Sequence, residues 1–170
     1  MLTHGSRQLR SWLIFDVGQK MSAASSFRVK FAIASDDRFA ALSRAFDRVR
    51  ECKAKDEWPE EKEAWVPYFD SKALNHFWWP SPAELKDWER RYFSTPVPKR
   101  FTDPSLRHPW DFMSLFEAFK NGDYALGMIE RVSAKEGVLS FDPCGHPYGG
   151  TGCMRALIEA FDHRVTEEPE

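Results

Sequence analysis

The sequence predicts an α+β fold, with an antiparallel or mixed sheet that carries its helices mainly on one face. Two observations lead to this class: apolar residues alternate in short segments near both ends of the chain, and they recur at helical spacing in the segments that follow. We expect the order ββα at both ends with a helical middle, because hairpins favour antiparallel pairing. The 170 residues suffice for one domain, placed at 11–166 after a flexible leader at 1–10.

The N-terminal elements are two strands and a long helix. Strands are expected at 11–17 and 27–34, and the second shows the alternation of a half-buried strand. Ser35 is placed to cap the following helix, where acidic residues favour the positive end of the helix dipole. The apolar stripe of that helix runs from Phe39 to Val49.

The middle of the chain is expected to be mainly helical. Residues 64–70 could form a short edge strand and 71–79 a helical turn. Residues 81–84 read Ser-Pro-Ala-Glu, which combines a serine cap, an early proline and a glutamate that completes a capping box. Four prolines within 94–109 then predict a long ordered loop over the surface.

The C-terminal part is predicted as helix, hairpin and helix. The helix at 109–120 ends at Asn121-Gly122, a pair that favours a left-handed stop. Two strands follow, at 123–133 and 138–141, and a turn rich in proline and glycine leads to the last helix.

Composition and charge exclude several function classes. A formal net charge of −2 provides no overall basic field, which disfavours nucleic acid as a partner. Three cysteines are too few and odd in number for a disulfide framework. The apolar stretch at 12–15 is too short for a signal peptide, and no later stretch is long enough to cross a membrane. We therefore expect a cytoplasmic protein that neither spans nor binds a membrane.

Aromatic residues make up 15% of the chain, with 14 Phe, 7 Trp and 4 Tyr. Many of them lie in the acidic middle region, and some rings are expected to remain at the surface. Exposed aromatic rings beside carboxylates favour a protein partner over nucleic acid. The predicted partner-binding residues are Trp58, Glu60, Glu61, Trp65, Trp78 and Trp79.

An alternative site is the turn before the last helix, where a small ligand or a phosphate could bind to an enzyme. Glycines there let backbone N–H groups approach a ligand, and a helix N-terminus attracts anions. The residues of this alternative are Cys144, His146, Tyr148, Gly149, Gly150, Thr151 and Gly152. The P-loop pattern is absent, and Thr151 could instead simply cap the helix.

Metal binding and catalysis receive weaker support from the residues. Cys144, His146 and Cys153 lack the ligand spacing of a structural zinc site, and His163 would have to serve as the fourth ligand. Cys144 and His146 could also be a nucleophile and base, but no orienting third group is evident. We therefore expect no metal and no cofactor, and the residues favour a binding function over an enzymatic one.

The C-terminal segment resembles a group of known proteins. Residues 141–143 (Phe-Asp-Pro), 147–152 (Pro-Tyr-Gly-Gly-Thr-Gly) and the helix at 154–161 are similar to the end of small uncharacterised bacterial proteins. Some of those resemble immunity proteins of bacterial toxin systems. The resemblance implies a non-enzymatic protein that binds and blocks a toxin. The sequence leaves the oligomeric state open.

Overall fold

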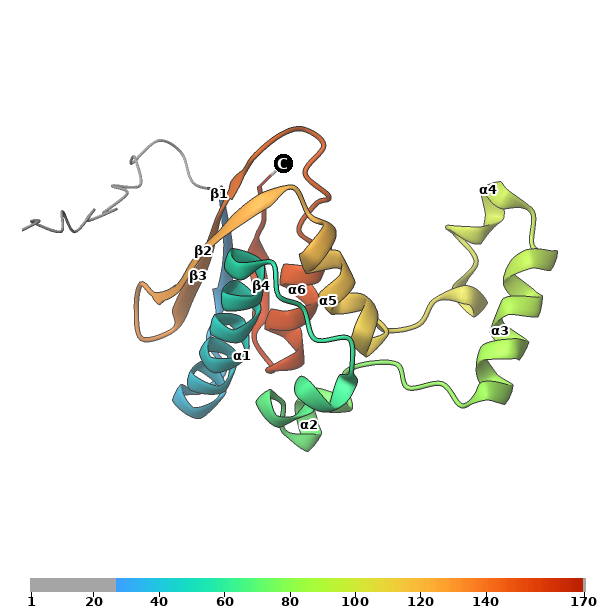
Figure 1. Cartoon of the computed structure of the whole chain (residues 1–170), viewed down its shortest axis with the longest axis horizontal. Coiled ribbons are helices and arrows are strands. Elements are labelled where there is room, and N and C mark those ends of the chain that lie inside the picture. The colour runs from blue at the N-terminus through green and yellow to red at the C-terminus, as the bar shows by residue number, and fades with distance from the viewer. Residues whose placement is uncertain (1–26, 170) are drawn as a thin grey trace, which may run out of the picture.

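The computed structural model describes residues 27–169 and confirms the α+β class (Figure 1). Its four strands form one open sheet, antiparallel throughout, in the order β2-β3-β1-β4. The strands are β1 Phe27–Ala32, β2 Tyr124–Arg131, β3 Glu136–Pro143 and β4 Arg164–Glu167. The leader at 1–10 and the strand expected at 11–17 lie outside the described residues.

Six α-helices and three 3-10 turns account for the other elements of the described chain. The helices are α1 Asp36–Lys55, α2 Ser71–Leu74, α3 Pro82–Ser94, α4 Val97–Arg100, α5 Phe112–Asn121 and α6 Gly152–Ala160; the turns are η1 Lys62–Ala64, η2 Val66–Tyr68 and η3 Pro104–Leu106. Two predicted caps are confirmed. The Ser35 hydroxyl accepts from the Arg38 N–H, and Ser81 and Glu84 form the capping box.

Four local predictions were wrong. Residues 64–70 form 3-10 turns in place of a strand, and the region 94–109, expected to be a loop, contains α4 and η3. Gly122 ends α5 with φ −65°, so no left-handed residue is needed there. The last helix is followed by β4, which makes the C-terminal order ββαβ. Sequence patterns missed β4 because it is only four residues long and none of them is fully buried.

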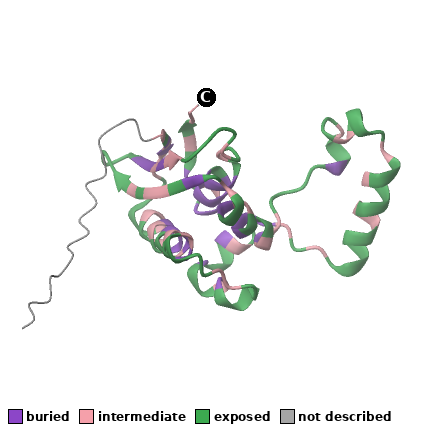
Figure 2. Ribbon diagram, turned by 45° about the horizontal axis from the view of Figure 1, so that its top comes forward, coloured by how far each residue is buried: buried purple, intermediate pink, exposed green. Residues whose placement is uncertain are grey.

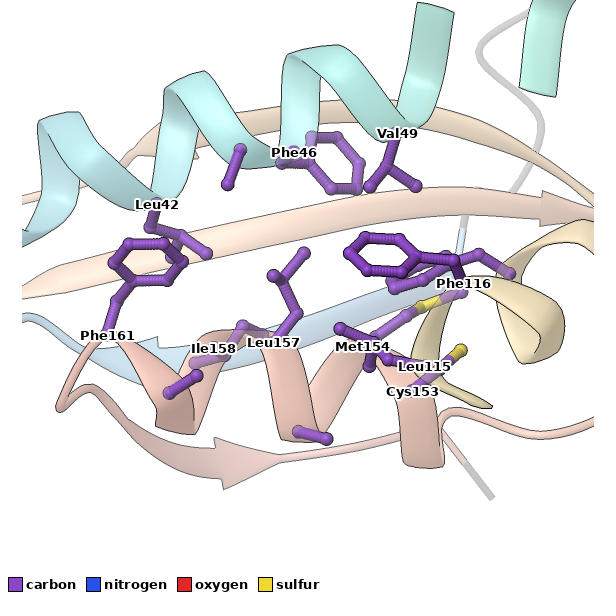
Figure 3. Packing of buried hydrophobic residues seen from close by; sticks show 14 of the residues in the cluster. Leu42, Phe46, Val49, Leu115, Phe116, Cys153, Met154, Leu157, Ile158 and Phe161 are labelled. Carbon is purple, nitrogen blue, oxygen red and sulfur yellow. The ribbon is translucent and has the colours of Figure 1, made fainter. Parts of the chain in front are cut away.

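The hydrophobic core lies between the sheet and the helices α1, α5 and α6. Figure 3 shows Leu42, Phe46 and Val49 of α1 pointing toward Met154 and Leu157 of α6, with the strands behind them. All five side chains are fully buried. The two helices therefore cover one face of the sheet, as the sequence predicted. The strands contribute Val29, Phe31, Leu139 and Phe141 to the same core.

A helical arm, residues 80–109, projects from this body and contains α3, α4 and η3 (Figure 1). Neither α3 nor α4 buries a residue, and Leu106 is the single buried residue of the arm (Figure 2). At its base the backbone N–H of Trp78 donates to the carbonyl of Trp110 at 2.8 Å, which holds the two connections together. The arm is thus anchored at its base and has little hydrophobic support elsewhere.

His163 is a buried polar residue at the edge of the core. Its Nδ1 accepts the backbone N–H of Ala34 at 3.0 Å, so Nε2 carries the proton and has no hydrogen-bond partner. Its ring packs on Phe31 at 5.4 Å and Phe39 at 6.4 Å between centroids. This burial lowers the pKa of His163, and the positive charge of Arg38 acts in the same direction.

We predict that His163 makes the folded protein less stable in mild acid. Below about pH 6.5 the unfolded chain binds a proton at this position that the folded chain resists, so the free energy of unfolding falls as the pH decreases. His163→Asn keeps an acceptor for Ala34 and removes the titration. Urea unfolding between about pH 7.5 and pH 5.5 should show a smaller loss of stability in this variant than in the wild type. Parallel pH profiles for the two proteins would contradict the assignment.

Candidate functional site

Trp65, predicted to contact a partner, is instead a core residue. Its side chain is 0% exposed and stacks on Phe116 of α5, with ring centroids 3.9 Å apart. Its indole N–H donates to the carbonyl of Pro59 at 3.1 Å, which satisfies its one polar group. The prediction for Trp65 was wrong because the loop after α1 folds back over α5 and turns this ring inward.

The loop that precedes Trp65 keeps its acidic surface. Glu60 and Glu61 are exposed, and the half-buried Trp58 packs on Trp65 with ring centroids 6.1 Å apart. Residues 56–63, here called the acidic loop, contain five acidic residues and one lysine, a formal charge of −4. The acidic loop therefore presents several carboxylates beside one partly accessible tryptophan.

Trp78 and Trp79 lie at the base of the arm. Trp78 is half-buried and stacks on His108 with centroids 4.0 Å apart. Trp79 is exposed, yet its ring stacks on Phe112 and its indole N–H donates to the Leu74 carbonyl at 2.8 Å. Both rings thus contribute to holding the arm on the body.

The most exposed aromatic rings lie farther out on the arm. Phe93 is 71% exposed, Val97 57% and Phe101 76%. All three fall within residues 90–101, here called the arm tip, which contains four basic residues and no acidic one. Large apolar side chains that have basic neighbours and lack cover from their own chain are typical of an interaction surface.

Interactions within the arm fix the shape of its tip. The Arg100 guanidinium lies 4.7 Å from the ring centroid of Tyr92 and 5.9 Å from that of Phe93, and its Nε donates to the Thr95 carbonyl at 2.8 Å. Tyr92 in turn stacks on Trp88 at 4.9 Å. The arm tip is therefore held in shape before any partner binds, which reduces the entropy lost on binding.

The sequence contained a signal for the arm tip that our predictions missed. A stripe through Leu85, Trp88 and Tyr92 leaves the adjacent Phe93 on a different side of α3, because neighbouring helix residues point about 100° apart. A large apolar residue off the stripe of an amphipathic helix marks a second contact surface. Phe101, beside Lys99 and Arg100, is a similar signal inside the region assigned to a loop.

The turn before α6 owes its glycines to backbone shape. Gly149 and Gly150 have φ of 92° and 76°, in the left-handed region that favours glycine. The Thr151 hydroxyl, expected to bind a phosphate or cap the helix, donates to the Glu168 carboxylate at 2.7 Å. Arg155 forms an ion pair with the same carboxylate. Glu168 therefore occupies two of the groups that a bound anion would need.

The other residues proposed for that turn do not converge on one cavity. Cys144 and His146 are exposed, whereas Tyr148 packs on Phe27 and Phe141 at 5.9 and 5.6 Å. Gly152 begins α6.

The thiol of Cys153 is buried and contacts the Tyr124 hydroxyl at 3.2 Å. Its burial raises the pKa of the Cys153 thiol, which disfavours the reactive thiolate. Residues 27–169 contain no cluster of three or more His, Cys, Asp or Glu side chains that could hold a metal ion.

Comparison of the chain with models of protein families, with curated proteins and with solved structures yields no match. Among residues 27–169, no helix has both the length and the apolar character that crossing a membrane requires. The arm tip and the acidic loop are therefore the surfaces from which a function can be inferred.

Replacing Trp65 should destabilise the fold, whereas replacing a tip residue should not. Trp65→Ala leaves a cavity over Phe116 and should lower the free energy of unfolding by about 3–5 kcal/mol. Phe93→Ala, at an exposed position, should change it by less than about 0.5 kcal/mol. Chemical denaturation of the two variants measures both values, and a large loss in Phe93→Ala would show that the tip supports the fold.

Proposed function

We propose that this protein is a non-enzymatic protein-binding module that contacts its partner through the arm tip. The observation that carries the proposal is the exposure of Phe93, Val97 and Phe101 on an arm that buries almost nothing in its own chain. Binding energy in protein interfaces is concentrated in aromatic and arginine side chains at such positions. Lys99 and Arg100, beside Phe101, would supply the polar rim of the contact.

The cysteine and histidine side chains of the described residues support a catalytic function less than the arm tip supports a binding function. The Cys153 thiol is buried with its pKa raised, and His163 is buried with its pKa lowered. Cys144 is exposed, and its Sγ contacts the Asp142 carbonyl at 4.0 Å; among residues 27–169 no hydrogen bond joins its thiol to a basic side chain. Nucleophilic catalysis needs a base within hydrogen-bond reach of the nucleophile.

The narrower form of the proposal is an immunity-like protein whose partner is a toxin. It rests on the resemblance of the segment around the last helix to such proteins. The preformed arm supports this narrower proposal, since a projecting element can enter and cover the active site of another protein. Three cysteines without a disulfide between them agree with a cytoplasmic location.

The test is affinity capture from cells of the source organism with matched variants. Phe93→Ala/Phe101→Ala should lower the recovery of the partner at least tenfold, because each anchor contributes about 2 kcal/mol or more to such a contact. Met128→Ala/Val132→Ala is the matched control, because these residues are 53% and 55% exposed on the sheet body. The control should capture as much partner as the wild type does.

Two results would contradict the proposal. Equal recovery with both double variants would mean that the arm tip is not the contact surface. Tight binding of a labelled oligonucleotide that needs Phe93 and Phe101 would place the protein among nucleic-acid binders, because basic residues beside aromatic rings also suit stacked bases.

A further inference from the structure

The arm tip and the acidic loop carry equal and opposite charges. Residues 90–101 hold four basic side chains and no acidic one, a formal charge of +4, whereas residues 56–63 carry −4. We infer that the arm tip of one molecule binds the acidic loop of a second copy, so that two molecules form a reciprocal dimer. This inference rests on the proposed function, because it names a partner for the same tip.

Both surfaces keep charged side chains that are free for an intermolecular contact. Lys99 is exposed, and none of the ion pairs of residues 27–169 includes it. The same holds for Glu60 and Glu61 of the acidic loop. Arg90 shares Asp87 with Arg91 on the surface of α3, a pairing that is weak in water. Opposite charges in these positions would steer two copies toward each other.

The acidic loop also borders two hollows, both lined by Trp58, that could receive the exposed rings of the tip. The first has a volume of about 390 Å³, and its wall combines Trp58, Ala54 and Tyr124 with charged residues of both signs. The second has a volume of about 380 Å³, and its wall combines Trp58, Cys52 and Pro59 with charged residues of both signs. Pockets of roughly 300 Å³ or more accept groups larger than one aromatic ring. Phe93 or Phe101 of a second copy could therefore enter beside Trp58 while the charges pair around it.

The contact has to form between molecules in the observed arrangement. Figure 1 shows the arm leading away from the body, with α4 at its far end. The tip residue Arg100 makes its hydrogen bonds and cation–π contacts within the arm, with Tyr92, Phe93 and Thr95. A two-fold axis would place each tip on the partner's acidic loop, which closes the assembly and doubles the contact. Two copies of the contact bury twice the area of one, which matters because stable interfaces bury about 1,200–2,000 Å² in total.

A charge-swap experiment on the full chain tests the dimer. Light scattering after size-exclusion chromatography should give twice the monomer mass for the wild type at low salt, with weaker association as salt screens the charges. Arg90→Glu/Arg91→Glu/Lys99→Glu changes the formal charge of the tip from +4 to −2, so that both surfaces are acidic. Glu60→Lys/Glu61→Lys/Glu63→Lys changes the formal charge of the loop from −4 to +2, so that both surfaces are basic. Each triple variant alone should be a monomer, because like charges then face each other.

An equimolar mixture of the two triple variants should restore a dimer with one chain of each kind. In that dimer every tip again faces a loop of opposite charge, so a structural defect of either variant could not explain the rescue. Lys135→Glu, which changes an exposed charge in the β2–β3 turn, is the control and should leave the dimer intact.

Three outcomes would overturn the inference: a wild type that stays monomeric up to millimolar concentration, triple charge variants that still dimerise, or a mixture that remains monomeric. The proposed function fails separately. A monomeric wild type whose capture of a different protein depends on Phe93 and Phe101 would end the dimer and leave the protein-binding tip in place. Equal capture by the two double alanine variants would end the proposed function.

Discussion

The stack of Trp65 on Phe116 is the contact on which the arrangement of the middle region depends. It closes the loop after α1 over α5 and adds a large ring to a core already filled by the sheet, α1 and α6. Phe69 and Phe77 continue this aromatic cluster through edge contacts with Phe112. With the space over the sheet occupied, the chain between α2 and α5 has no further core to join, and it leaves the body as an arm.

The arm compensates for the missing core with local contacts. Trp78, Trp88, Tyr92 and His108 stack on one another, and the indole N–H of Trp88 donates to the Leu106 carbonyl at 3.0 Å. These contacts use one side of the arm and leave the apolar residues of its tip in water. An isolated helix of 13 residues is marginal by itself, so covering the tip with another protein would stabilise the arm as well as create the contact.

The turn before α6 differs from the two charged surfaces in how its charges are paired. At the turn, Glu168 satisfies Thr151 and Arg155, so charge and hydrogen bonding are balanced within the chain. At the tip and the acidic loop, Lys99, Glu60 and Glu61 have no such internal partner among the described ion pairs. A polar group that its own chain already satisfies gains little from a ligand, whereas an unpaired charge beside exposed apolar area gains from a complementary surface.

Local sequence patterns were enough to predict the α+β class, the caps at Ser35 and Ser81 and the buried face of α1, because helical spacing and capping are local properties. They also identified the acidic residues Glu60 and Glu61. Which rings are buried became clear from the three-dimensional contacts alone. Trp65 and Phe93 are both large and apolar, yet one lies under a folded-back loop and the other at the end of an arm. Burial depends on contacts between residues far apart in the chain, such as those of Trp65 with Phe116 and of Thr151 with Glu168, and no local pattern encodes them.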